Sequence, residues 1–337
     1  MSAEGVSARR LAYRRAAPLV ALLRACHASP LVVCAAGDRG YTPHERRGGV
    51  ARVLSPSRST EFTSGRSVSP AELTTSISGC LSGEELLLLV EQHLTAFNYI
   101  NASAALTKLA KLHPVEQWNN DARTQLLLVR AGELLDKMGG RQLANSAWAC
   151  SKLGVTPAWL PRWVELTTRE LGTMKPQELS NSVYALGGFC HSPGDAWLRA
   201  FYTASLDMSA FNPQALSNIL FSLALLKEVP DALWTDAFWS ASKEKMAKFK
   251  PQQLSNIVWA AASLGVPPPA DWMIHFWNAS KSAETADFIP QYLSNIIWAA
   301  AAIGQEIVPP SDWMTFFWAA SREKMELFTE QGLSNTI

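Results

Sequence analysis

Apolar and polar residues follow a helical spacing in six consecutive blocks of this chain. Each block contains a leucine, a small residue and an asparagine, and the asparagines lie 36, 37, 38, 39 and 40 residues apart. They are Asn145, Asn181, Asn218, Asn256, Asn295 and Asn335. A nearly constant period of this length is typical of arrays of supersecondary units, each of which must stack on its neighbours to bury its apolar face. We take the asparagine as position zero of each repeat.

Each block predicts a helix, helix A, that begins near position −5. This position is proline in four repeats, and proline suits the first turn of a helix, where its missing N–H would be unpaired anyway. On a wheel of about 100° per residue, positions −2, +2, +5 and +9 form one mostly apolar side, the expected buried seam. Positions −1 and +6 are mostly serine or alanine, which allows another helix to approach closely. Gly154, Gly265 and Gly304 are stop signals, so helix A should have about fourteen residues.

A second apolar run follows a proline-bearing turn and predicts helix B. In one repeat this run is Asp271–Trp277. Paired aromatics mark the equivalent helix elsewhere: Trp159 with Trp163, Trp197 with Phe201, Trp234 with Trp239, and Trp313 with Trp318. Large aromatics at helical spacing most simply supply core area between stacked helices. The expected fold is therefore all-α, a right-handed α-solenoid of tandem helical hairpins with a period of about 36–40 residues.

The opposite side of helix A is rich in carboxamides. Positions −4, zero and +7 share this side, with glutamine at −4 in five repeats and asparagine at zero in all six. Carboxamides offer a donor and an acceptor, the equipment needed to read base edges. The aromatics at +3, which could stack on unpaired bases, are Trp148, Tyr184, Phe221, Trp259 and Trp298. The alternative is that asparagine forms a buried polar ladder between repeats and that the aromatic only packs.

Position −3 varies in an otherwise strict repeat. It is Glu178, Ala215, Gln253, Tyr292 and Gly332 in successive repeats. Recognition of one nucleotide per repeat would require variation at a surface that borders the carboxamides. Plain solvent exposure would produce the same variation, so both interpretations stay open.

The N-terminal region differs from the repeats in charge. Residues 1–60 contain ten arginines and three acidic residues, a balance of +7, which leaves −6 for the rest of a chain of net charge +1. From Gly5 to Gly37 there is no acidic residue, as in organellar transit peptides; the alternative, a secretory signal, is interrupted early by Arg24. We expect residues 1–60 to be a disordered transit peptide that directs the protein to the chloroplast, with the mitochondrion as the alternative. We expect residues 61–82 to be a linker.

Two helical stretches, Glu84–Leu112 and Ala122–Met138, precede the repeats. Asn101 matches position zero, so we interpret residues 83–140 as degenerate capping helices. Residues 141–337 are the tandem repeats. The chain stops two residues after a repeat asparagine, so we expect the last repeat to be truncated.

No catalytic, cofactor or metal site is indicated. The histidines and the five cysteines have no metal-ligand spacing, and no phosphate-binding loop, Gly-x-Ser-x-Gly or Cys-x-x-Cys motif occurs. Cys150 and Cys190 fall within helix A patterns, where a small buried apolar role is expected. No apolar run approaches the roughly 18 residues that a membrane span needs. We expect a protein that is not an enzyme, takes no cofactor and has no membrane partner.

The segment Pro251–Ala260, Pro-Gln-Gln-Leu-Ser-Asn-Ile-Val-Trp-Ala, followed by Pro-Pro-Pro-Ala-Asp-Trp at Pro267–Trp272, resembles the octotricopeptide repeat of organellar RNA-binding proteins. The resemblance covers about residues 141–337. It implies a helical solenoid that binds organellar transcripts and acts in their stability, processing, splicing or translation. The array is short for this family.

We therefore hypothesise a sequence-selective adaptor for single-stranded organellar RNA, in which each repeat contacts about one base. RNA-processing or ribosome-associated proteins are further candidate partners. The candidate RNA-binding residues are Gln177, Glu178, Asn181, Gln214, Asn218, Gln252, Gln253, Asn256, Gln291, Tyr292 and Asn295. The alternative is a protein–protein interaction scaffold without RNA binding, because concave helical surfaces also bind peptides and the repeats are acidic overall.

Overall fold

The computed structural model describes residues 68–112, 114, 117–282, 284–304 and 308–336, which form fifteen α-helices and no strand. The helices are α3 (Pro70–Gly79), α4 (Gly83–His93), α5 (Tyr99–Leu109), α6 (Ala122–Glu133), α7 (Gly140–Lys152), α8 (Leu160–Glu170), α9 (Pro176–Phe189), α10 (Asp195–Ala204), α11 (Pro213–Leu226), α12 (Ala232–Glu244), α13 (Pro251–Leu264), α14 (Ala270–Ser282), α15 (Pro290–Ile303), α16 (Ser311–Glu323) and α17 (Glu330–Thr336). The predicted transit peptide, residues 1–60, lies outside the described residues. Within the described residues, no helix has both the length and the apolar character to cross a membrane.

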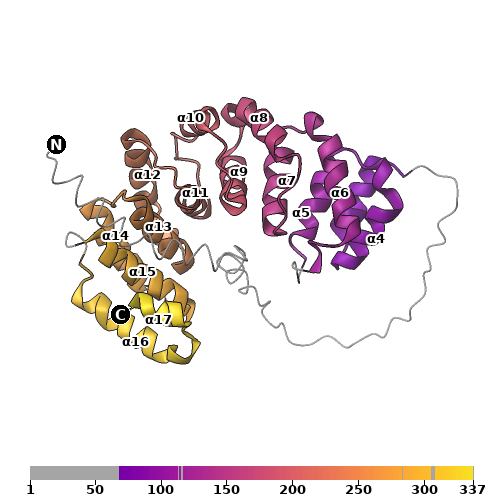
Figure 1. Cartoon of the computed structure of the whole chain (residues 1–337). Coiled ribbons are helices and arrows are strands. Elements are labelled where there is room, and N and C mark those ends of the chain that lie inside the picture. The colour runs from indigo at the N-terminus through magenta and orange to yellow at the C-terminus, as the bar shows by residue number, and fades with distance from the viewer. Residues whose placement is uncertain (1–67, 113, 115–116, 283, 305–307, 337) are drawn as a thin grey trace, which may run out of the picture.

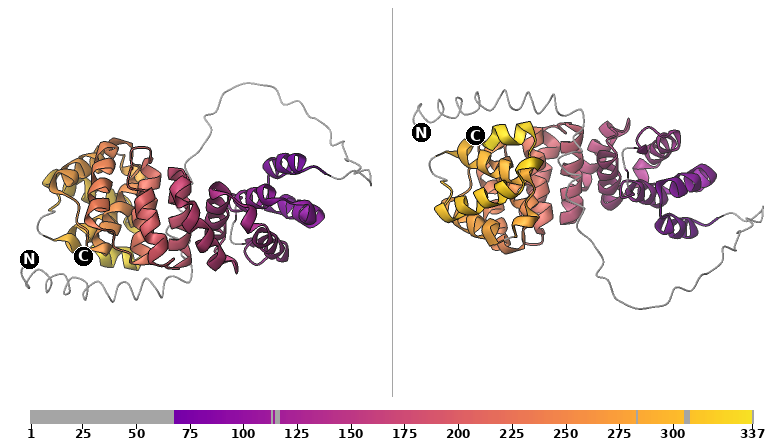
Figure 2. Two further views of the ribbon diagram at one scale, coloured as in Figure 1. Left: turned by 90° about the horizontal axis from the view of Figure 1, so that it is seen from above. Right: turned by 90° about the horizontal axis from the view of Figure 1, so that it is seen from below.

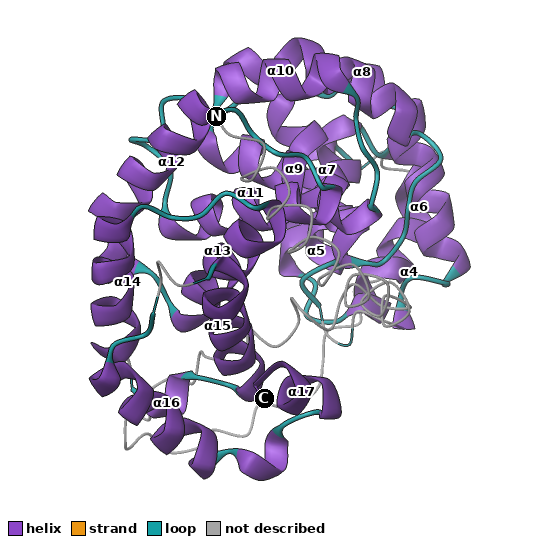
Figure 3. Cartoon of the chain, turned by 60° about the vertical axis from the view of Figure 1, so that its left-hand side comes forward, coloured by secondary structure: helices purple, strands orange, loops and turns teal. Residues whose placement is uncertain are grey.

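The helices form two layers that curve together (Figures 1 and 3). The odd-numbered helices correspond to helix A and pack one against the next as the inner layer, while the even-numbered helices B lie along the outside of the arc. Figure 2 shows the hairpins following one another in chain order along the array. The predicted all-α solenoid of tandem helical hairpins is confirmed.

Helix A begins and ends largely where its residues predict. α9, α11, α13 and α15 each begin at the proline at −5 and contain fourteen residues. Gly265 follows α13 with φ 68°, and Cys190 and Lys227 adopt the same left-handed conformation at the ends of α9 and α11, with φ 50° and 62°. Position +9 is thus the helix end, and its predicted place in the buried seam is wrong. For the same reason Cys190 is exposed, contrary to expectation, whereas Cys150 is buried.

Small side chains at −1 and +6 bring successive inner helices into close contact, as predicted. Ser217 Oγ, at −1 of α11, donates to the backbone oxygen of Gln253 in α13 at 3.2 Å. A Cβ added to Gly187, at +6 of α9, would lie 3.1 Å from the Cα of Ser222 in α11. The −1 and +6 side of one helix therefore faces the −3 and +4 side of the next.

Buried tryptophans connect the helices of the outer layer. Those that are at most 1% exposed are Trp163, Trp197, Trp234, Trp272 and Trp313. Four of their indole nitrogens donate to a hydroxyl of the preceding repeat at 2.8–3.0 Å: Trp197 to Thr167, Trp234 to Ser205, Trp272 to Ser242, and Trp313 to Ser280. The predicted core role is confirmed for these tryptophans. Of the other tryptophans in the predicted pairs, Trp239 is buried and Trp159 is half-buried, whereas Trp318 is 55% exposed, so the prediction is wrong for Trp318.

The array begins earlier than the composition predicts. α3 lies within residues 61–82, which were expected to be a linker, and it packs against α5. Ser69 caps the helix, and Leu73 and Ile77 form its buried side. The Ser- and Thr-rich composition hides this short apolar side. The stretch expected at Glu84–Leu112 is divided into α4 and α5 by a turn.

The register of the first inner helices also differs from the prediction. Ser103 Oγ in α5 donates to the backbone oxygen of Gln142 at 3.2 Å, the contact that serines at −1 make elsewhere. Position zero of α5 is therefore Ala104, three residues after Asn101. Asn101 lies at −3, where it is buried and its Nδ2 donates to the backbone oxygen of Pro70 at 2.9 Å. Its match to the repeat asparagine is a coincidence of residue type.

Candidate functional site

The carboxamides of neighbouring repeats lie beside one another on the inner layer. Asn181 Nδ2 in α9 donates to Asn145 Oδ1 in α7 at 3.3 Å. Gln253 Nε2 in α13 donates to Gln214 Oε1 in α11 at 2.7 Å, and Gln214 Nε2 donates to Asn218 Oδ1 at 2.9 Å. We term the amides at −4 and zero of the inner helices α7 to α15 the amide row: Asn145, Gln177, Asn181, Gln214, Asn218, Gln252, Asn256, Gln291 and Asn295.

The amide row reaches solvent to different degrees. Gln177 and Gln214 are exposed, and Asn256 is the most covered member at 8%. The half-buried members are Asn145, Asn181, Asn218, Gln252, Gln291 and Asn295. Asn145 and Asn181 bond to each other across repeats and Gln214 bonds to Gln253 of the next repeat, as the structural alternative predicts, yet most members of the row keep part of their surface accessible. Bonding between repeats and contact with a ligand are therefore compatible at this row.

Position −3 is largely closed off. Ala215, Gln253 and Tyr292 are buried, the latter two at 5% and 6% exposure, and Glu178 is half-buried. The expectation of an exposed position is wrong for the three buried residues, because −3 faces the preceding inner helix. Gln253 is connected to the amide row only through the hydrogen bond that its Nε2 donates to Gln214 Oε1. A single-helix wheel carries no information about which neighbour covers which flank.

Aromatic side chains at +3 run beside the amide row. Trp148, Tyr184, Trp259 and Trp298 are half-buried, and only Phe221 is buried. Phe221 and Trp259 lie with ring centroids 5.2 Å apart at an interplanar angle of 43°. The rings at +3 therefore pack against their neighbours and still keep part of their surface accessible for stacking on a base.

Cations on this side gather at the α5–α7 end. Arg141 replaces glutamine at −4 of α7 and is exposed, and Lys152 at +7 is half-buried. Lys111, at +7 of α5, places Nζ 5.9 Å from the centroid of the Trp148 ring. From α9 to α15 positions −4, zero and +7 carry no charge. A comparison of the residues at −4 between repeats would have revealed Arg141 from the sequence. Lys111 can be assigned to position +7 only with the corrected register of α5.

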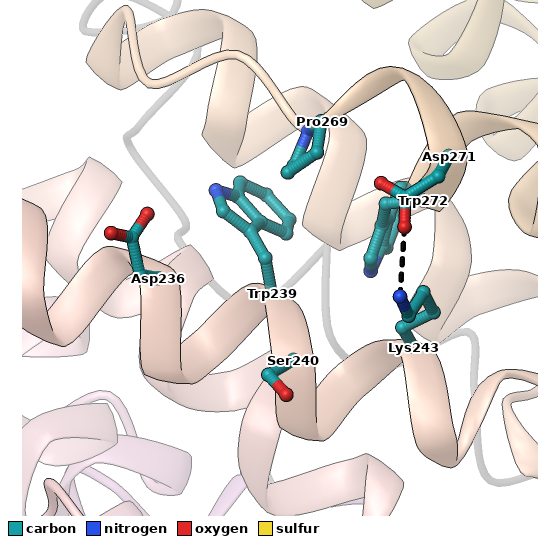
Figure 4. Close-up of a pocket in the computed structure, with 7 residues that line it drawn as sticks. All are labelled: Asp236, Trp239, Ser240, Lys243, Pro269, Asp271 and Trp272. Atoms are coloured by element: carbon teal, nitrogen blue, oxygen red, sulfur yellow. Dashed lines mark hydrogen bonds and ion pairs between the residues drawn. The ribbon is translucent and has the colours of Figure 1, made fainter.

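The outer layer holds a different set of charges. Lys243 of α12 forms a 2.7 Å ion pair with Asp271 of α14 beside Trp239 and Trp272, in a shallow hollow (Figure 4). The Lys243 ammonium holds the pKa of the Asp271 carboxyl below its usual range. Lys281 pairs in the same way with Asp312 of α16. Within the described residues, no group of three or more His, Cys, Asp or Glu side chains could hold a metal.

Tandem helical hairpins stacked in two layers define the class of this protein as an α-solenoid repeat protein. Residues 242–337 match the family model described as the Tbc2 translation factor, N-terminal domain. This match extends from the end of α12 through α17 and covers the last repeats of the array. No curated protein matches the chain significantly.

Proposed function

We propose that this protein binds single-stranded RNA of the chloroplast, or alternatively of the mitochondrion, along its inner layer and serves translation as a non-catalytic adaptor. The amide row is the observation that carries the proposal. The translation role is taken from the name of the matched family, Tbc2 translation factor, and from the resemblance to octotricopeptide repeats. Further partners would be proteins of RNA processing or of the ribosome.

In this proposal the amide row contacts base edges. Gln177 and Gln214 are its most accessible members, and each can offer a donor and an acceptor to an unpaired base. Gln253 acts as a positioning residue, because its Nε2 bond orients the Gln214 amide. Glu178 borders the row at −3 and is half-buried, so it can contact RNA directly. Tyr292, at −3 of α15, is buried and would support the row only by packing.

The aromatics and cations have separate roles in this proposal. Partly accessible rings at +3 supply stacking faces, which tolerate any base. Lys111, Arg141 and Lys152 contact phosphates and so contribute affinity without selectivity. Because positions −4, zero and +7 from α9 to α15 carry no charge, selectivity there would come from amide contacts.

One observation favours the second candidate, a scaffold that binds proteins. Positions −4, zero and +7 from α9 to α15 carry no charge, so this part of the inner layer lacks the dense cations of most RNA-binding surfaces. A peptide could lie along the amide row and exchange hydrogen bonds through its backbone. A binding assay with single-stranded RNA separates the two candidates.

The test compares two asparagine substitutions in the full chain against a random single-stranded RNA library. Asn218→Ala removes an inner-layer amide, and Asn278→Ala removes an exposed amide from the outer helix α14. We expect Asn218→Ala to weaken RNA binding about tenfold, since one lost polar contact costs on the order of 1 kcal/mol, and Asn278→Ala to leave it unchanged. Equal affinities for both variants, or no RNA binding by the parent chain, would contradict the proposal.

A further inference from the structure

Successive outer helices meet through a three-part contact. At the α12–α14 boundary the Trp239 ring lies 5.1 Å from the Trp272 ring, centroid to centroid. Ser242 Oγ accepts the Trp272 indole N–H at 2.8 Å, and Lys243 pairs with Asp271 at 2.7 Å. One helix thus supplies Trp239, Ser242 and Lys243, and the next supplies Asp-Trp in its first turn. Figure 4 shows the two tryptophans and the ion pair of this contact.

The α14–α16 boundary repeats this contact. The Trp277 ring lies 4.7 Å from the Trp313 ring, and Ser280 Oγ accepts the Trp313 indole N–H at 2.9 Å. Lys281 pairs with Asp312. In both cases the serine follows the packing tryptophan by three residues and the lysine follows it by four.

α16 presents the equivalent tryptophan, serine and cation, the last an arginine in place of lysine, without a partner among the described residues. Trp318 is 55% exposed, whereas the equivalent Trp239 and Trp277 are 4% and 6% exposed. Ser321, three residues on, is buried, and its Oγ has no hydrogen-bond partner among the described residues. Arg322, four residues on, is exposed and makes no ion pair within the described part of the chain. Among the described residues Ser222 Oγ and Ser255 Oγ, inside the array, also have no partner, so the unpaired hydroxyl counts only together with the exposed Trp318 and the unpaired Arg322. The three groups together match one half of the contact at the other two boundaries.

The geometry points to a docking surface on α16 for the helix B of a further hairpin of this type, one that presents Asp-Trp in its first turn. Its tryptophan would cover Trp318 and donate to Ser321 Oγ, and its aspartate would pair with Arg322. α17 already packs against α15, so the inner helix of this unit is in place. This inference concerns the outer layer and does not rest on RNA binding.

A second copy of this chain does not fit the same surface. Both Asp-Trp pairs of the described chain, at Asp271 and Asp312, are already engaged. At the opposite end of the array α4 opens with Gly83 and two glutamates and contains no tryptophan. A head-to-tail dimer would therefore leave Ser321 without a donor.

The experiment adds one further hairpin to the full chain. A copy of residues 296–323 is fused directly after Asn335, so that the added helix B carries Asp-Trp in register. Ser321→Ala is then made in the original α16 only, once in the chain without the extension and once in the extended chain. In the chain of 337 residues we expect this substitution to leave the thermal midpoint unchanged or slightly higher, because it removes an unpaired buried hydroxyl. In the extended chain it should lower the midpoint by about 2–4 °C.

A second extended protein carries Asp312→Ala and Trp313→Ala within the added copy only. In this protein Ser321→Ala should again leave the midpoint unchanged. The same response to Ser321→Ala in all three backgrounds would overturn the proposal, as would an intact extension that adds no helical circular dichroism. Concentration-dependent dimers of the parent chain that Trp318→Ala abolishes would instead assign the surface to a second copy.

Discussion

The indole nitrogen of Trp272 donates a 2.8 Å hydrogen bond to Ser242 Oγ, which ties α14 to α12 inside the outer layer. Both side chains are fully buried, so Ser242→Ala would leave the indole N–H without a partner. We expect the free energy of unfolding to fall by about 1–3 kcal/mol. Ser240→Ala, on the exposed side of the same helix, should change it by less than about 0.5 kcal/mol. Urea denaturation of both variants measures the difference, and equal stabilities would contradict the bond's role.

The close approach of α9 and α11 predicts that Gly187 tolerates no side chain. A Cβ there would lie 3.0 Å from Ser222 Cβ and 3.1 Å from its Cα. Gly187→Ala should destabilise the protein by about 1–2 kcal/mol, because overpacking outweighs the gain in helix propensity. Gly172→Ala is the control, since an added Cβ there has no atom within 4 Å. A thermal midpoint for Gly187→Ala at or above that of Gly172→Ala would refute close packing at this site.

The cations at the α5–α7 end predict part of the salt dependence of RNA binding. Replacing Lys111, Arg141 and Lys152 together by alanine should flatten the slope of log affinity against log salt by about 2, since each phosphate contact on a single strand contributes roughly 0.7. Lys243→Ala and Lys281→Ala together form the control, because both lysines are paired with aspartates in the outer layer. An unchanged slope in the triple variant would remove these cations from the RNA-binding surface.

Thiol reactivity tests the helix ends. Burial raises the pKa of the Cys150 thiol above its ordinary value, so little reactive thiolate forms near neutral pH, and reagent has no access. Cys190 is exposed where α9 ends. In the native protein at neutral pH we expect maleimide to modify Cys190 and to spare Cys150 until denaturant is added. Peptide mapping by mass spectrometry distinguishes the two, and rapid native modification of Cys150 would contradict the buried seam.

Periodicity predicted the repeat architecture well, because each helix carries its own boundaries. The prolines at −5 and the fourteen-residue spacing to the helix end are local signals, and the structure confirms them. The left-handed ends at Cys190 and Lys227 had no such signal, since most residues other than glycine and asparagine avoid this conformation. The helix end there is set by the turn into helix B.

The candidate site was less predictable, because exposure depends on neighbouring helices. The sequence placed the amides on one side of helix A, but it could not show that Gln253 and Tyr292 face the preceding inner helix. Trp318 resembled the other helix B tryptophans in sequence and differs only in what packs against it. Residue type predicted the chemistry of these positions, and tertiary packing decided their accessibility.

Photocrosslinking to 4-thiouridine-containing single-stranded RNA tests the central claim most directly. Mass spectrometry of the crosslinked full chain should place nucleotide adducts on the inner helices α7, α9, α11, α13 and α15. The aromatics beside the amide row, above all Trp148, Tyr184, Trp259 and Trp298, should be the main sites. Adducts confined to the outer helices α8, α10, α12, α14 and α16, or no adducts at all, would contradict an RNA-binding surface on the inner layer.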